Sequence, residues 1–170
     1  MRIDRNHWLF ALLLGVACLT TWWVSNVQFY ARINAESAML GSMWAVIATI
    51  FVLRESHAKS LSAGLIRILS TVSSGIICLV YFLIFPFSPF GLALLVALSY
   101  LIANVVGRPD DALPSGVTIS VIMVVGALNP DKAWLEPILR LADTLIGSAV
   151  AIGAAFIGGA FLDEDKLAGG

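Results

Sequence analysis

The chain has 170 residues, of which 59% are hydrophobic and 12% are charged, and its mean hydropathy is +0.94. Soluble domains carry about 25% charged residues because their surface must be hydrated, so this composition excludes a soluble globular protein. The net charge of −1 gives no basis for a nucleic-acid partner.

Six apolar segments follow one another along the chain. Each approaches the ~20 residues that a membrane-spanning helix needs. Because lipid offers the backbone no hydrogen-bond partner, each segment is predicted to be helical. The predicted spans of this single transmembrane domain cover residues 8–29, 35–53, 64–85, 90–106, 112–128 and 134–162. We therefore expect an all-α, polytopic membrane bundle of six transmembrane helices.

The distribution of Lys and Arg predicts the orientation, because basic residues gather on the cytoplasmic side. With six spans, both termini lie on one side. That side collects Arg2, Arg5, Arg54, Lys59, Arg67, Arg108 and Lys166, and the opposite side holds Arg32, Lys132 and Arg140. This bias predicts that both termini are cytoplasmic.

The third and sixth spans open with the same pattern, which is Arg, then Thr four residues later, then Gly three or four residues after that. Two units of three helices are therefore plausible, and because three is odd, the second would enter from the opposite face. Such inverted repeats are common in secondary transporters, which bind substrate at the repeat interface. The residues of the pattern are Arg67, Thr71 and Gly75 in the third span, and Arg140, Asp143, Thr144 and Gly147 in the sixth.

This pattern has the chemistry of a small-anion site. Spacings of three and four residues place the Arg, Thr and Gly on one stripe of a helix. The guanidinium supplies a bidentate fork, the Gly lets a ligand approach the backbone, and a nearby helix N-terminus adds positive charge. Two alternatives compete with this interpretation. Both Arg side chains could extend to the headgroups as anchors, and Arg140 could form a structural pair with Asp143.

Two further features are open to a packing and a functional interpretation. Small residues that lie four apart on the sixth span are typical of close helix packing in lipid; they are Gly147, Ala151, Ala155 and Gly159. Tryptophans are common at membrane interfaces, but Trp44 lies near the middle of its span. Trp44 is therefore a candidate stacking surface for an aromatic ligand.

No motif for a cofactor, a metal or a catalytic nucleophile is present in the sequence. His7 and His57 have no companion at ligand spacing, and Cys18 and Cys78 lie within apolar segments as small packing residues. We expect neither an enzyme nor a cofactor.

The stretch from Trp44 to Gly75 resembles the fusaric acid resistance protein-like family, which is related to aromatic acid exporters and, more distantly, to plant aluminium-activated malate channels. The family pattern is a Trp-bearing helix before Arg-x-x-Gly-Thr-x-x-Gly, and later Arg-Leu-x-Asp-Thr-x-x-Gly. The second motif matches residues 140–147 closely. The first departs, because Ser70 replaces its Gly and Gly75 comes one residue late. The resemblance covers the chain from about residue 38 onward and implies a six-helix membrane domain that moves organic anions.

Our leading hypothesis is an inner-membrane efflux protein for small organic, principally aromatic, acids, which acts as a homo-oligomer. Arg67 and Arg140 would attract the carboxylate, Thr71 and Thr144 would supply hydroxyls, and Trp44 would stack on the ring. One alternative is a non-transporting scaffold or assembly subunit of a larger complex. Another is a passive anion channel that uses the same residues.

Overall fold

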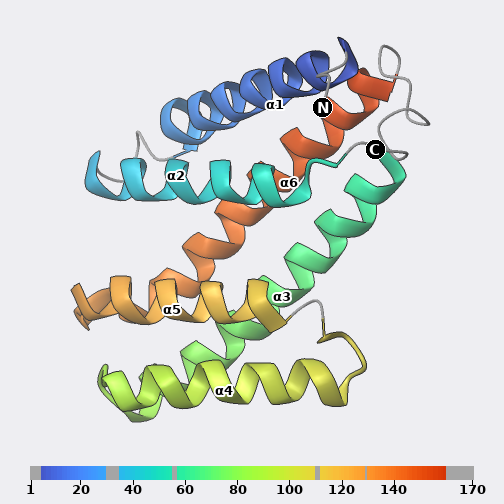
Figure 1. Cartoon of the computed structure of the whole chain (residues 1–170). Helices are drawn as coiled ribbons and strands as arrows, with labels where there is room; N and C mark the ends of the chain where they lie inside the picture. The colour runs from blue at the N-terminus through green and yellow to red at the C-terminus, as the bar shows by residue number, and fades with distance from the viewer. Residues whose placement is uncertain (1–4, 30–34, 55–56, 110–111, 129, 160–170) are drawn as a thin grey trace. The chain divides into compact units, whose positions relative to one another are not determined.

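The computed structural model describes residues 5–29, 35–54, 57–109, 112–128 and 130–159, and within them all the regular structure is helical. Figure 1 shows the α-helices as coiled ribbons. In chain order the elements are α1 (Arg5–Trp23), the π-helical η1 (Val24–Phe29), α2 (Ala35–Val52), α3 (His57–Ile84), α4 (Pro89–Val105), α5 (Ala112–Leu128), the 3-10 helix η4 (Pro130–Leu135) and α6 (Glu136–Gly159).

The helices have the length and polarity of a polytopic membrane bundle. Three segments, 5–27, 59–84 and 130–159, are long and apolar enough to cross a membrane, and the apolar helices at 38–52, 89–105 and 112–128 are shorter. The 28 residues of α3 extend about 42 Å at 1.5 Å per residue, which exceeds the ~30 Å of hydrocarbon in a bilayer. The expected all-α membrane fold is confirmed.

The third helix begins earlier than the sequence predicts, at His57 instead of residue 64. Arg67 therefore lies almost three turns inside α3, and the expected support from a helix N-terminus does not apply to it, because that effect fades within the first turn. Arg140 does lie one turn into α6, which begins at Glu136.

The described residues group into two compact units, and α3 and α6 each contribute to both. Of the described residues, unit 1 comprises 5–29, 35–54, 57–65 and 143–159, and unit 2 comprises 66–109, 112–128 and 130–142. The element order still gives a pair of helices followed by a long helix twice. The boundaries of the compact units nevertheless cut through α3 and α6, and the inverted repeat stays a prediction.

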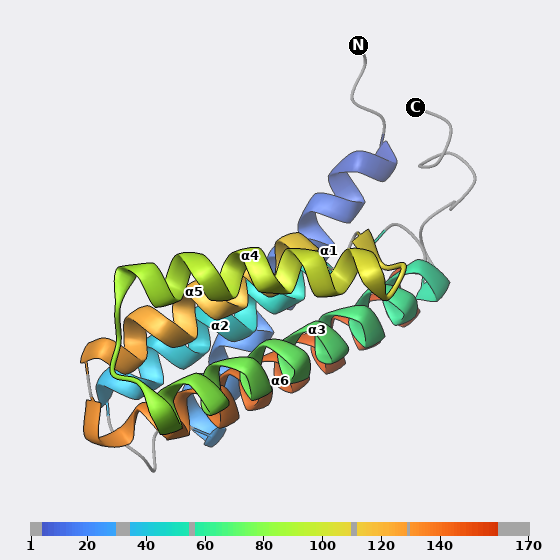
Figure 2. The same cartoon turned by 90° about the horizontal axis from the view of Figure 1, so that it is seen from below.

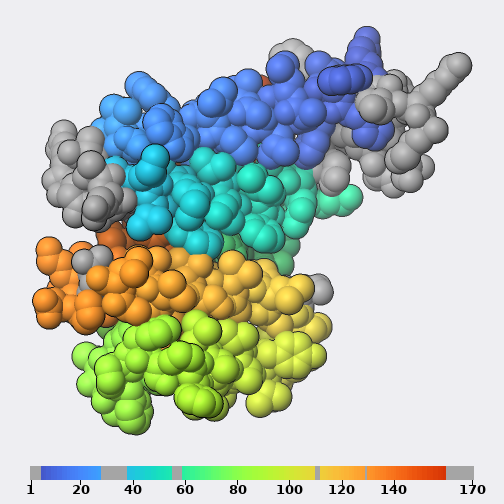
Figure 3. All heavy atoms as spheres, turned by 60° about the vertical axis from the view of Figure 1, so that its left-hand side comes forward, coloured from blue at the N-terminus to red at the C-terminus, as the bar shows by residue number. Residues whose placement is uncertain are grey.

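In unit 1, α1 and α2 run antiparallel and in contact along their length, as Figure 3 shows in blue and cyan. Two threonine hydroxyls and a backbone carbonyl join three helices in this unit. Thr49 Oγ1 of α2 lies 2.8 Å from Thr21 Oγ1 of α1 and donates to the Gly147 carbonyl of α6 at 3.1 Å. The apolar core beside it consists of Ala17, Val52, Leu53, Ala151 and Ala155.

In unit 2, α4 and α5 run antiparallel and side by side (Figures 1 and 2). The chain turns between α3 and α4 where two prolines predict a turn, with Ser88 at the N-cap of α4. Gly91 lets the Tyr81 ring of α3 approach, because a Cβ at this position would overlap the phenol. The core consists of Cys78, Leu95, Ile119, Ile122 and Met123, so Cys78 is a packing residue.

Candidate functional site

Arg67 is buried inside unit 2, with 4% of its surface exposed. Its Nη1 donates to the Pro114 carbonyl at 3.4 Å, near the start of α5. The Thr118 hydroxyl donates to the same carbonyl at 2.9 Å. The guanidinium therefore contacts the neighbouring helix within the unit and is not extended toward solvent.

The residues that follow Arg67 on α3 are committed to helix contacts. The hydroxyls of Ser70 and Thr71 donate to the Arg67 carbonyl at 3.0 and 2.8 Å. A Cβ added at Gly75 would lie 3.4 Å from the Pro137 side chain, so this glycine lets the start of α6 pack closely. Thr71 and Gly75 therefore contribute to helix contacts within unit 2, and the ligand role that the sequence assigns to them stays a prediction.

Arg140 is also 4% exposed, and its Nη2 lies 3.6 Å from Oε2 of Glu136, one turn earlier on α6. The Glu136 side chain is 12% exposed. Only Asp143 was predicted as a partner of Arg140, and Glu136 was missed. The i, i+4 spacing was the available signal, because residues four apart on a helix are neighbours.

The remaining candidates belong to unit 1. Asp143 and Thr144 are buried, and Trp44 is half-buried on α2. At Gly147 a Cβ would overlap the Ala45 carbonyl and lie 2.8 Å from the Ala48 side chain. Contact with α2 therefore occupies the bare face of Gly147, the face to which the sequence assigns a ligand.

The small-residue ladder of α6 is buried over three of its four positions. Gly147 packs on α2, Ala151 and Ala155 join the core of unit 1, and Gly159 is exposed. Gly158, which does not belong to the ladder, is the buried glycine at this end of the helix.

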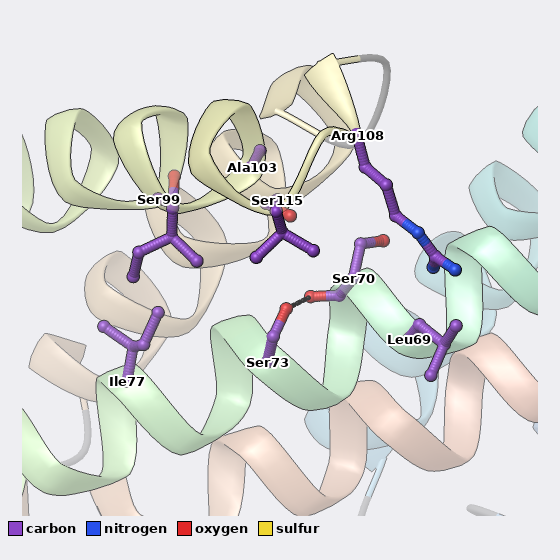
Figure 4. A pocket seen from close by; sticks show the side chains of 10 residues that line it. Leu69, Ser70, Ser73, Ile77, Ser99, Ala103, Arg108 and Ser115 are labelled. Atoms are coloured by element: carbon purple, nitrogen blue, oxygen red, sulfur yellow. Dashed lines mark hydrogen bonds between the residues drawn. The ribbon is translucent and has the colours of Figure 1, made fainter.

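A cleft of about 220 Å³ opens in unit 2 between α3, α4 and α5 (Figure 4). Four serines and one arginine supply its polar groups, and none of them was a candidate in the sequence analysis. The Arg108 side chain extends from the connection between α4 and α5 toward Ser70 and Leu69, while Ile77 and Ser99 lie at the other end. The polar lining residues are Ser70, Ser73, Ser99, Ser115 and Arg108.

The geometry offers cationic and hydroxyl groups, and no metal centre is evident in the part of the chain that is described. Within that part, no three His, Cys, Asp or Glu side chains are grouped closely enough to hold an ion. The cationic and hydroxyl groups can bind an anion or a hydrogen-bonding ligand.

Residues 38–154, well over half of the chain, match the fusaric acid resistance protein-like family. The chain belongs to this family. Fusaric acid resistance-like proteins are membrane transport proteins of the efflux type, and this chain is an integral membrane protein of that kind. Comparison with curated proteins and with solved structures gave no significant match.

Proposed function

We propose that this protein exports small organic acids, principally aromatic ones, across a bacterial inner membrane. In this proposal Arg67 and Arg140 of unit 2 attract the substrate carboxylate. A guanidinium is suited to this role because its planar fork matches a carboxylate in two parallel hydrogen bonds.

The observation that supports the proposal best is the burial of both arginines. The anchoring alternative requires side chains that reach headgroups or water, but Arg67 and Arg140 are each only 4% exposed. A charged residue inside a membrane bundle costs about 2.5–3.5 kcal/mol on insertion scales and usually marks a substrate or ion pathway. Family membership independently supports transport.

The proposal is tested by flux of labelled benzoate in proteoliposomes that contain the purified full chain. We expect Arg67→Lys and Arg140→Lys each to lower flux about tenfold or more, because an ammonium cannot reproduce the bidentate fork. Arg54→Gln is the control, since Arg54 is an exposed arginine of unit 1. Thermal unfolding of each variant identifies loss of fold. Unchanged flux in both folded lysine variants would remove these residues from the mechanism.

We also propose that both termini lie in the cytoplasm, on the basis of the bias of basic residues along the chain, and that the protein acts as a homo-oligomer. Light scattering on the natively purified protein tests the assembly. Unrelated subunits in the purified complex would favour the scaffold alternative. A fluorescent protein fused to the C-terminus reports the side of the membrane, because it fluoresces only in the cytoplasm.

A further inference from the structure

The cleft between α3, α4 and α5 has a polarity that changes along its length. Arg108 lies at one end, and its guanidinium has five N–H donors and no acceptor. This end therefore suits an anionic group of a ligand. Arg108 is exposed, so a ligand can reach it without disturbing the core.

Three of the four serines of the cleft present acceptors, because their own protons already serve the helices. Ser70 donates to the Arg67 carbonyl at 3.0 Å, Ser73 to the Ser70 carbonyl at 3.0 Å and Ser99 to the Val96 carbonyl at 2.8 Å. A hydroxyl has one donor and two acceptor lone pairs, so these three oxygens retain lone pairs. A ligand that donates a hydrogen bond fits them without breaking any existing bond.

Apolar side chains line the cleft at both ends, with Leu69 beside Arg108 and Ile77 beside Ser99. Leu69, Ile77 and Ile102 line the cleft together with the serines. The volume of about 220 Å³ exceeds the ~150 Å³ cavity that holds benzene and is below the ~300–1,000 Å³ of drug-sized sites. A single substituted ring therefore fits the space.

We propose that this cleft binds a monocyclic aromatic carboxylate that carries a hydrogen-bond donor on the far side of its ring. The carboxylate binds Arg108, the ring lies against Ile77 and Ile102, and the donor reaches Ser99 or Ser73. This inference rests on the proposed function for its substrate class, but the site is distinct from Arg67 and Arg140. Arg108 and Ser99 are here specificity-determining residues.

The test compares 4-aminobenzoate with 4-methylbenzoate, which have the same shape and charge and differ in the ring donor. Binding to the purified full chain in a neutral detergent is measured by calorimetry. We expect 4-aminobenzoate to bind about two- to tenfold more tightly, as one neutral hydrogen bond allows. Ser99→Ala should remove part of this preference, and Ser73→Ala with Ser99→Ala should abolish it. Ser120→Ala is the matched control, because Ser120 makes a similar helix bond on α5 outside the cleft.

Arg108→Gln should weaken both ligands about tenfold or more, because it removes a charge-assisted bond. Equal affinity of the two benzoates, or binding unaffected by Arg108→Gln, would overturn the site. Benzoate flux that persists with unaltered binding in Arg108→Gln would refute the cleft and leave the proposed function standing. Arg108-dependent binding without flux of any acid would refute transport and leave the cleft standing.

Discussion

Gly147 lets α6 pack closely against α2 in unit 1, and Gly147→Ala tests this contact. The added Cβ would overlap the Ala45 carbonyl and lie 2.8 Å from the Ala48 Cβ. Backbone and a short side chain cannot rotate away, so α2 and α6 must separate. Overpacking of this kind costs about 1–3 kcal/mol. Separation also lengthens the Thr49–Gly147 hydrogen bond of 3.1 Å, which is worth about 0.5–1.5 kcal/mol.

Gly153→Ala is the matched control on the same helix. Nothing lies within 4 Å of a Cβ at Gly153, so only helix propensity changes, and alanine is favoured by about 0.5–1 kcal/mol. The same gain offsets part of the cost at Gly147, which leaves a net loss of roughly 1–3 kcal/mol.

The two variants are compared by thermal unfolding of the purified protein in detergent. A change of 1 kcal/mol shifts the Tm by about 2–4 °C for a chain of this size. We therefore expect Gly147→Ala to melt several degrees below the wild type and Gly153→Ala to melt at or above it. Equal melting temperatures of the two variants would refute the close contact of α2 with α6.

Two further changes address buried polar contacts. Thr49→Val removes the hydroxyl that donates to the Gly147 carbonyl and should lower the free energy of unfolding by about 0.6–1.5 kcal/mol. Thr20→Val, at an exposed threonine of α1, is the control and should leave the Tm unchanged. Glu136→Gln removes the carboxylate beside Arg140 and should lower the free energy of unfolding by up to about 3 kcal/mol in the same assay. A variant as stable as the wild type would show that the ion pair contributes nothing.

The helices were largely predictable from the sequence because hydropathy reports which residues lie in lipid. It reports less about where a helix ends, and this explains the error at α3. Its first turns include Lys59 and Ser60, which hydropathy assigns to a loop, yet a helix can continue beyond the hydrocarbon with polar residues. Arg67 was consequently placed too near a helix terminus.

The candidate site was less predictable, because its geometry depends on residues from different helices. Glu136 was detectable by its spacing from Arg140, because residues four apart on a helix are neighbours. Arg108 was considered only as a charge that sets orientation. No local spacing reveals that it shares a cleft with Ser70 of α3 and Ser99 of α4.

The most direct test of the proposed export of aromatic acids is the flux of labelled acids through the purified wild-type chain in liposomes. Benzoate and benzamide have the same ring and differ in the carboxylate, and protein-free liposomes give the background permeation of each. If transport depends on the two buried guanidinium groups, we expect protein-dependent flux of benzoate and no protein-dependent flux of benzamide. Benzoate flux no faster than in protein-free liposomes would contradict the account.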